Sequence, residues 1–193
     1  VAANRAFDQA DLIITLGARF SDRVALNPAK FGRRAKIVQV DIDKSEINKN
    51  VIIDKAVVGD VREFLIRALP HVDEKKHEEW HERVQGWRSK ERVVKSPECR
   101  LHPKEIIDVI CEMSDENTIY VTDVGQHQMW AAQYVKHNKS KKFITSGGLG
   151  TMGFGYGAAI GAQLGCPKDR VVHITGDGSF HMNLNEACTA VSQ

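Results

Sequence analysis

Short apolar runs alternate with longer amphipathic stretches along most of this chain. Apolar runs of strand length stand at positions 11–17 and 36–42, and a shorter one follows at 55–60. The stretch that begins at Val61 has helical spacing, and Asp60 stands where a helix N-cap is expected. Strands that alternate with helices indicate a parallel sheet.

The same alternation returns after Pro103, a residue type favoured in the first turn of a helix. Apolar runs predict strands at 118–124, 142–145 and 170–175. Helical spacing predicts helices at 104–113 and 126–135 and from about Phe180, and 147–165 is a glycine-rich helix region. In the glycine-rich stretch we expect a turn at Gly147, Gly148 and Gly150. We expect a flat helix face that packs on the sheet at Gly153, Gly157 and Gly161.

The segment between the two blocks is dominated by charge. Trp80, Val84 and Trp87 recur at helical spacing, which predicts a solvated helix with one apolar face. The letters HEEWH at 77–81 match the zinc-protease pattern H-E-x-x-H. Zinc sites need a third ligand and a sheltered setting, so we expect this match to be accidental.

The pattern predicts an α/β protein with two doubly wound, Rossmann-like parallel-sheet units, both incomplete. Positions 1–70 form the first unit, 71–101 a charged helical linker, and 102–193 the second unit.

Composition excludes several functional classes. Hydrophobic residues make up 42% of the chain, enough for a core. The 27 basic and 25 acidic residues give a net charge of +2 that is spread along the sequence, which predicts neither nucleic-acid nor membrane partners. Positions 147–166 carry no charge, but eight of these residues are glycines, so membrane insertion would be weakly driven.

Two further features predict the cellular compartment of the protein. The four cysteines, Cys99, Cys111, Cys166 and Cys188, are widely spaced, which is typical of reduced thiols in a cytoplasmic protein. The first twenty residues lack the basic and apolar regions of a signal peptide.

Candidate ligand-binding residues follow the strands of the second block. Ligands of doubly wound folds bind beyond the carboxyl ends of the strands. Gly125 opens a helix whose first backbone N–H groups, at Gln126 and His127, suit an anion. Asp177 stands between two glycines after the last strand, where a carboxylate can hold Mg²⁺ together with phosphate oxygens.

Each feature also has a simpler explanation. A lone G-D-G is most often a turn, His127 could be a structural histidine, and Met152 a core residue. Together, at successive strand ends, they predict a metal–diphosphate site, and these residues alone leave the cofactor's identity open.

Longer motifs make the resemblance specific. GDGSF resembles the start of the thiamin diphosphate motif, in which an asparagine follows some two dozen residues later. TDVGQHQMWAAQ and SGGLGTMGFG resemble the catalytic subunit of acetolactate synthase (acetohydroxyacid synthase). GARFSDRV, VDIDKSEINKN and VVGDV are similar to stretches that form the FAD site of that family.

The resemblance implies two cofactor sites and a metal ligand. Thiamin diphosphate would contact Gly125, Gln126, His127, Gly148, Met152, Gly176, Asp177, Gly178 and Ser179. Met152 would lie beneath the thiazolium ring, and Asp177 would hold Mg²⁺. FAD, in a structural role, would contact Gly17, Ala18, Arg19, Arg23, Val24, Asp41, Ile42, Glu46, Asp60 and Val61.

The implied reaction condenses two pyruvates, or pyruvate and 2-oxobutanoate, with release of CO₂. Its products are 2-acetolactate or 2-aceto-2-hydroxybutanoate, intermediates of branched-chain amino-acid biosynthesis. The family also implies a homodimer or tetramer of the catalytic subunit and allows a small regulatory subunit as partner.

The sequence departs from the family pattern at several points. Ser21 replaces an aspartate beside the FAD arginines, and Tyr156-Gly157 replaces Leu-Pro. The chain ends at Gln193, before the expected asparagine ligand, and the activating glutamate belongs to a segment outside it, so no catalytic residue is assigned here. We therefore expect the 193-residue piece alone to be inactive.

Other interpretations stay open. Pyruvate oxidase, glyoxylate carboligase and sulfoacetaldehyde acetyltransferase share parts of these motifs. A non-catalytic nucleotide-binding module or a degenerate subunit is the alternative from another class. A nicotinamide dehydrogenase is disfavoured, because no G-x-G-x-x-G follows the first strand.

Overall fold

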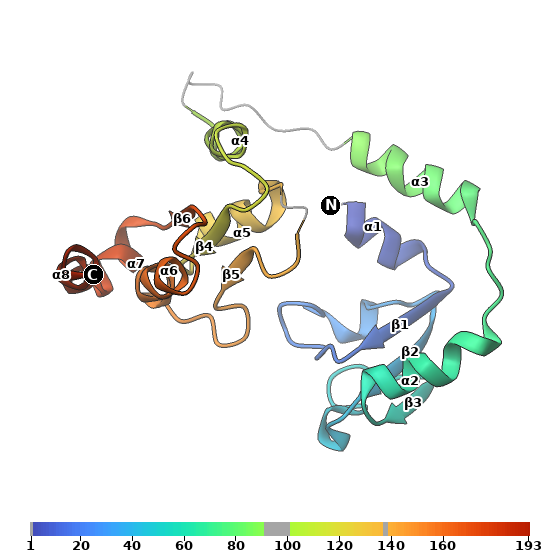
Figure 1. The fold of residues 1–193 in the computed structure, drawn as a ribbon. Helices are drawn as coiled ribbons and strands as arrows, with labels where there is room; N and C mark the ends of the chain where they lie inside the picture. Colours follow the sequence, from blue (N-terminus) through green and yellow to red (C-terminus); the bar gives the residue numbers. More distant parts are fainter. Residues whose placement is uncertain (1, 91–100, 137–138) are drawn as a thin grey trace. The chain divides into compact units, whose positions relative to one another are not determined.

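The computed structural model describes residues 2–90, 101–136 and 139–193, which fall into two compact units (Figure 1). These units are Val1–Arg92 and Val93–Gln193. Each contains a three-stranded parallel sheet flanked by helices, which confirms the α/β class. The predicted boundaries at 70 and 101 stay a prediction.

The first unit contains the sheet β1-β2-β3. Its strands are β1 (Leu12–Leu16), β2 (Lys36–Asp41) and β3 (Lys55–Val58), and its α-helices are α1 (Ala2–Gln9), α2 (Val61–Ala68) and α3 (Glu78–Ser89). Three short 3₁₀ turns, η1 (Pro28–Lys30), η2 (Lys44–Glu46) and η3 (Leu69–His71), complete it. Asp60 caps α2 as expected, accepting hydrogen bonds from the backbone N–H groups of Arg62 (2.9 Å) and Glu63 (3.1 Å).

One face of the first sheet is buried and the other is open along β1. The core cluster contains Ile13, Phe20, Ala25, Ile37 and Val51. On the opposite face of β1, Leu12, Ile14 and Leu16 are 40–50% exposed. The alternation therefore follows the two-residue period of a strand that is covered on one side.

Part of the charged segment forms α3, on which the two tryptophans that were predicted to share a face lie close together. The Trp80 and Trp87 rings lie 5.9 Å apart in an edge-to-face arrangement, and the Arg83 guanidinium lies 5.4 Å from the Trp87 ring. His77, the first residue of the HEEWH match, precedes the helix with a left-handed φ of 33°. No cluster of three metal-ligating side chains occurs within the described ranges.

The second unit contains the sheet β5-β4-β6. Its strands are β4 (Ile119–Thr122), β5 (Phe143–Thr145) and β6 (Val171–Ile174), and its α-helices are α4 (Pro103–Glu112), α5 (Gln126–Tyr134), α6 (Phe154–Gly165), α7 (Asp177–Met182) and α8 (Ala187–Ser192). A short 3₁₀ turn, η4 (Leu184–Glu186), joins the last two helices. All four residues of the central strand β4 are buried.

Two helices begin at different residues from those predicted. Helix α6 starts at Phe154 rather than at 147, because Gly150 and Gly153 adopt left-handed φ values of 65° and 87° that a right-handed helix does not contain. Helix α7 starts at Asp177 rather than near Phe180. Among the described residues, no helix combines the length and the apolar character that crossing a membrane requires.

The predicted glycine face of α6 is wrong. Added Cβ atoms at Gly157 and Gly161 would meet nothing within 4 Å, so these residues face away from the sheet. Gly155 and Ala159, one turn apart, are the buried residues of the helix. An added Cβ at Gly155 would lie only 2.8 Å from the backbone nitrogen of Asp123, so this glycine permits the close approach of helix and strand.

Two glycine-to-alanine changes in α6 test this packing. We expect Gly155→Ala to lower the free energy of unfolding by about 1–3 kcal/mol, because the new methyl group overlaps the backbone of Asp123. Gly157→Ala, the matched control, should raise it by up to about 1 kcal/mol through helix propensity alone. Urea denaturation of the two variants measures the difference, and equal effects would contradict the packing described here.

Candidate functional site

A pocket of ≈ 420 Å³ lies at the carboxyl edge of the second sheet. The lining residues come from the segments that follow β4 and β6 and from the turn that precedes α6. They are Val124, Gly125, Gln126, His127, Trp130, Met152, Thr175, Gly176, Asp177, Gly178 and Ser179. Eight of the nine predicted thiamin diphosphate residues are therefore brought together. The ninth, Gly148, lies outside this lining, in an exposed loop.

Strand register explains why these segments meet. Thr122 pairs with Thr145 of β5 and with Ile174 of β6, so the three strands end level with one another. The chain leaves β4 for β5 on one side and later returns to β6 on the other, which makes the edge of β4 a topological switch point. This is the place where doubly wound sheets bind ligands.

The N-terminus of α5 offers unpaired donors to the pocket. Its N-cap is Gly125, which has no side chain to accept the first helical N–H groups. Gln126 and His127 supply the first two of these groups, at the positive end of the helix dipole. A side chain at position 125 would collide with the His127 ring, since an added Cβ would lie 2.8 Å from its Cε1.

The His127 ring is enclosed by glycines on two sides. An added Cβ at Gly176 would lie 2.9 Å from its Nδ1, just as one at Gly125 would meet Cε1. Its Nε2 is buried and has no hydrogen-bond partner among the described residues. Burial lowers the pKa of His127, while the negative charge of Asp123 opposes this shift. Desolvation thus favours the neutral imidazole.

Asp177 and Ser179 lie on the first turn of α7. Asp177 is exposed and lines the pocket. Ser179 is buried, and its hydroxyl donates a 2.8 Å hydrogen bond to the carbonyl oxygen of Val124. This bond ties the first turn of α7 to the segment that precedes α5.

Met152, in the segment before α6, lies close to Gly178 in the first turn of α7. Its side chain is 43% exposed, and its Cε lies 3.5 Å from the place where a Cβ of Gly178 would stand. The residues predicted from the motifs, Gly148 excepted, thus line one pocket formed by three loops.

Two polar residues beneath the pocket are missing from the sequence prediction. Asp123 is completely buried and accepts three backbone hydrogen bonds. The Nε2 of His173 is buried and has no hydrogen-bond partner in the described part of the chain, and the His173 ring stacks on Tyr156 with centroids 5.8 Å apart and planes at 10°. Tyr156 is one of the positions at which the resemblance implies a departure from the family pattern.

The predicted FAD residues are grouped in part at the carboxyl edge of the first sheet. Gly17 follows β1 with a φ of 61°, and an added Cβ would lie 3.8 Å from Val61 Cγ2. Asp41 ends β2, and its carbonyl oxygen accepts a 2.9 Å hydrogen bond from Gly59 after β3. The strand ends and the start of α2 therefore lie side by side.

The remaining FAD candidates lie in the loops around this edge. Arg19 and Arg23 are exposed in the segment after β1, next to Ala18 and Val24. Ile42 is 74% exposed after β2. Glu46 ends η2 and pairs with Lys49 at 2.6 Å. Both arginines are thus accessible to solvent.

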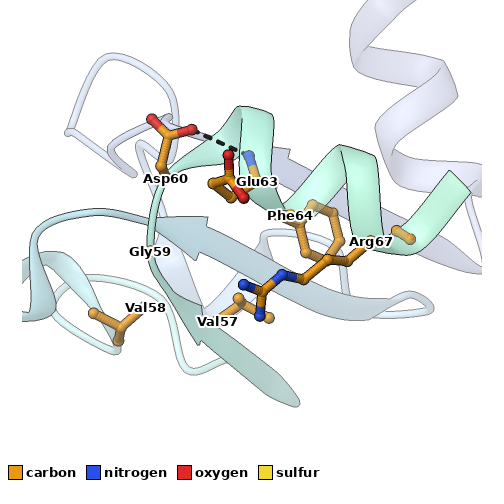
Figure 2. A pocket seen from close by; sticks show the side chains of 8 residues that line it. Val57, Val58, Gly59, Asp60, Glu63, Phe64 and Arg67 are labelled. Carbon is orange, nitrogen blue, oxygen red and sulfur yellow. Dashed lines mark hydrogen bonds between the residues drawn. The ribbon is translucent and has the colours of Figure 1, made fainter.

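A second pocket, of ≈ 440 Å³, lies between β3 and α2 (Figure 2). Its wall includes Val57, Phe64 and Arg67, whose guanidinium reaches over β3 towards Val57. Asp60 is the one predicted FAD residue in its lining, and the Asp60 carboxylate is occupied by the N–H groups that it caps. The motif residues of the first unit therefore do not assemble around this pocket.

Comparison with known proteins places both units in one family. Residues 1–68 match the thiamine pyrophosphate enzyme central domain, and residues 123–193 match the thiamine pyrophosphate enzyme C-terminal TPP binding domain. The chain therefore belongs to the thiamine pyrophosphate enzymes, whose cofactor is also called thiamin diphosphate.

Within this family the chain is homologous to acetolactate synthase large subunits. It is 43% identical over 98% of its length to acetolactate synthase 1, chloroplastic, of Nicotiana tabacum, covering 29% of that protein. It is 42% identical over 96% of its length to the acetolactate synthase large subunit of Lactococcus lactis, covering 32%. For the mitochondrial catalytic subunit of Aspergillus candidus the figures are 42%, 97% and 30%. The chain spans about a third of the length of the curated relatives it matches.

The pH dependence of stability tests the buried position of His173. Burial lowers the pKa of His173 in the folded protein, so the unfolded chain takes up a proton first, near pH 6.5. Above about pH 6.5 the free energy of unfolding should therefore contain the whole contribution of the neutral His173, and it should decrease as the pH falls below that value.

Variants at two histidines of the same unit isolate this effect. In urea denaturation at pH 7.5 and about pH 5.5, His173→Gln should reduce the loss of stability at the lower pH. His181→Gln, at an exposed position of α7, should leave it unchanged. Identical pH slopes in the two variants would show that His173 is accessible to protons in the folded state.

Proposed function

We propose that this chain provides the diphosphate- and Mg²⁺-binding part of an acetolactate synthase site. The observation that supports this most directly is the shared pocket of the α5 N-terminus and Asp177. In this proposal the family's reaction joins two pyruvates, or pyruvate and 2-oxobutanoate, with release of CO₂. Its products feed branched-chain amino-acid biosynthesis.

The residues of the pocket fit a magnesium-bridged diphosphate. The uncapped N–H groups of Gln126 and His127 suit phosphate oxygens, and the buried Nε2 of His127 has no partner within the described structure. Asp177 is the one carboxylate in the pocket lining. Mg²⁺ in phosphate sites is held by one or two carboxylates plus phosphate oxygens and water, so a single aspartate is a fitting donor set.

The chain's own residues would position the cofactor, and the cofactor would supply the carbanion chemistry. Gln126 and His127 would hold the diphosphate, Asp177 the metal, and Met152 the apolar support of the ring. The pocket lining contains no glutamate, so no described residue at the site is placed to activate the aminopyrimidine. We therefore propose that the 193-residue chain by itself binds thiamin diphosphate weakly and does not turn over pyruvate.

FAD, the assembly and the location are further parts of the proposal. The exposed Arg19 and Arg23, near the glycine at the end of β1, suit a diphosphate bridge such as that of FAD. Ser21 lies between them in place of the family's aspartate. A homodimer or tetramer in the cytoplasm, with a small regulatory subunit as a further partner, is the setting that we propose.

Calorimetric titration with thiamin diphosphate and Mg²⁺ tests the proposed site. We expect measurable binding to the 193-residue chain that Asp177→Ala weakens by at least about tenfold, because the metal loses its carboxylate ligand. Asp73→Ala, at an exposed position of the first unit, is the control and should bind as the unaltered chain does. Pyruvate should not be consumed in these samples.

Three outcomes of this titration are decisive. Equal binding by Asp177→Ala and the unaltered chain would remove Asp177 from the metal site. Binding of nucleoside diphosphates in preference to thiamin diphosphate would favour a non-catalytic nucleotide-binding module. Steady consumption of pyruvate would refute the proposed inactivity of the chain alone.

Quenching of FAD fluorescence tests the site in the first unit. We expect Arg19→Ala to weaken FAD binding about tenfold or more, since a charge-assisted contact to the diphosphate is lost. Arg67→Ala is the matched control, because Arg67 lies near the far end of α2 and lines the pocket of Figure 2 instead. A larger effect of Arg67→Ala would move the flavin to that second pocket.

A further inference from the structure

Asp123 is an ionisable residue with no exposed surface and no cationic partner among the contacts described. Its carboxylate instead accepts hydrogen bonds from three backbone N–H groups. Oδ1 accepts from Val124 and Gly153, both at 2.8 Å, and Oδ2 accepts from Gly155 at 3.0 Å. A buried carboxylate is costly unless such donors satisfy it, so both oxygens are committed to these bonds.

These bonds join loops that are about thirty residues apart in sequence. Val124 precedes the α5 N-terminus, whereas Gly153 and Gly155 flank the start of α6, directly after Met152. The backbone N–H of Asp123 also donates to the carbonyl oxygen of Ile174, at the end of β6. One residue therefore connects the three loops that carry the candidate diphosphate, ring and metal contacts.

The surroundings of Asp123 favour this role. The N-terminus of α6 places the positive end of a twelve-residue helix beside the carboxylate. The titratable groups that face it are His127 and His173, and burial lowers the pKa of both. The carboxylate is thus held by backbone dipoles, which fix the position of the backbone itself.

We propose that Asp123 is a positioning residue for the thiamin diphosphate site. It sets the separation between the diphosphate-binding turn at Gly125 and the turn that carries Met152, and so the span between the two ends of the cofactor. This inference rests on the proposed function. A diphosphate alone needs only one side of that span, whereas thiamin diphosphate needs both.

The test compares two ligands on two variants of the 193-residue chain. Asp123→Asn keeps the shape of the side chain but turns an NH₂ group towards backbone N–H donors, which pushes the Met152 turn away. We expect its affinity for thiamin diphosphate with Mg²⁺ to fall at least about tenfold, and its affinity for inorganic diphosphate with Mg²⁺ to change less than about threefold, by calorimetry.

Asp115→Asn is the matched control. Asp115 also holds a turn through a backbone N–H, that of Asn117 at 2.9 Å, but in the loop that precedes β4. This variant should bind both ligands as the unaltered chain does. Parallel loss of both ligands in Asp123→Asn, or loss of neither, would overturn the positioning role.

A second variant keeps the inference testable if Asp123→Asn does not fold. Asn183 holds the same turn from its other side, where its Nδ2 donates to the carbonyl oxygen of Gly153 at 2.9 Å. Asn183→Ala should again weaken thiamin diphosphate more than inorganic diphosphate, and an equal effect on both would contradict the inference. An unaltered chain that binds neither ligand would refute the proposed function itself and this inference with it.

Discussion

The parallel pairing of β4 with both β5 and β6 is the constraint on which the second unit depends. Four consecutive buried residues make β4 the centre of the sheet, and its register brings the ends of its two neighbours level with Thr122. Parallel strands point all their carboxyl ends to one edge, so loops that are distant in sequence must share that edge. The pocket is a consequence of this topology before any side chain is considered.

Glycines then allow the rings of His127 and His173 to lie close to the backbone at the carboxyl edge of the second sheet. The His127 ring occupies the space that side chains at positions 125 and 176 would take, and the Nε2 of His173 occupies the space beside position 155. Asp123 and Ser179 are buried beneath the pocket, and their side chains hold the neighbouring loops in place through hydrogen bonds to backbone groups. Asp123 and Ser179 thus hold the backbone, while His127 and Asp177 line the pocket.

The sequence was sufficient for the strands and for most of the pocket, because strand periodicity and glycine motifs are local signals. It was not sufficient for Asp123, which lies at the end of a predicted strand and whose role is visible only once its partners thirty positions away are known. His173 was missed for a similar reason, since it lies inside a short apolar strand. Spacing by four also favoured Gly157 and Gly161 over Gly155 as packing residues, and only the three-dimensional contact of α6 with Asp123 decides between them.

A crystal structure of the chain grown with thiamin diphosphate and Mg²⁺ tests the central claim most directly. The account predicts the metal on the carboxylate of Asp177 and the diphosphate against the first N–H groups of α5, with Met152 beneath the ring. A diphosphate bound elsewhere, for example in the pocket of Figure 2, would contradict it. So would a metal held by residues other than Asp177.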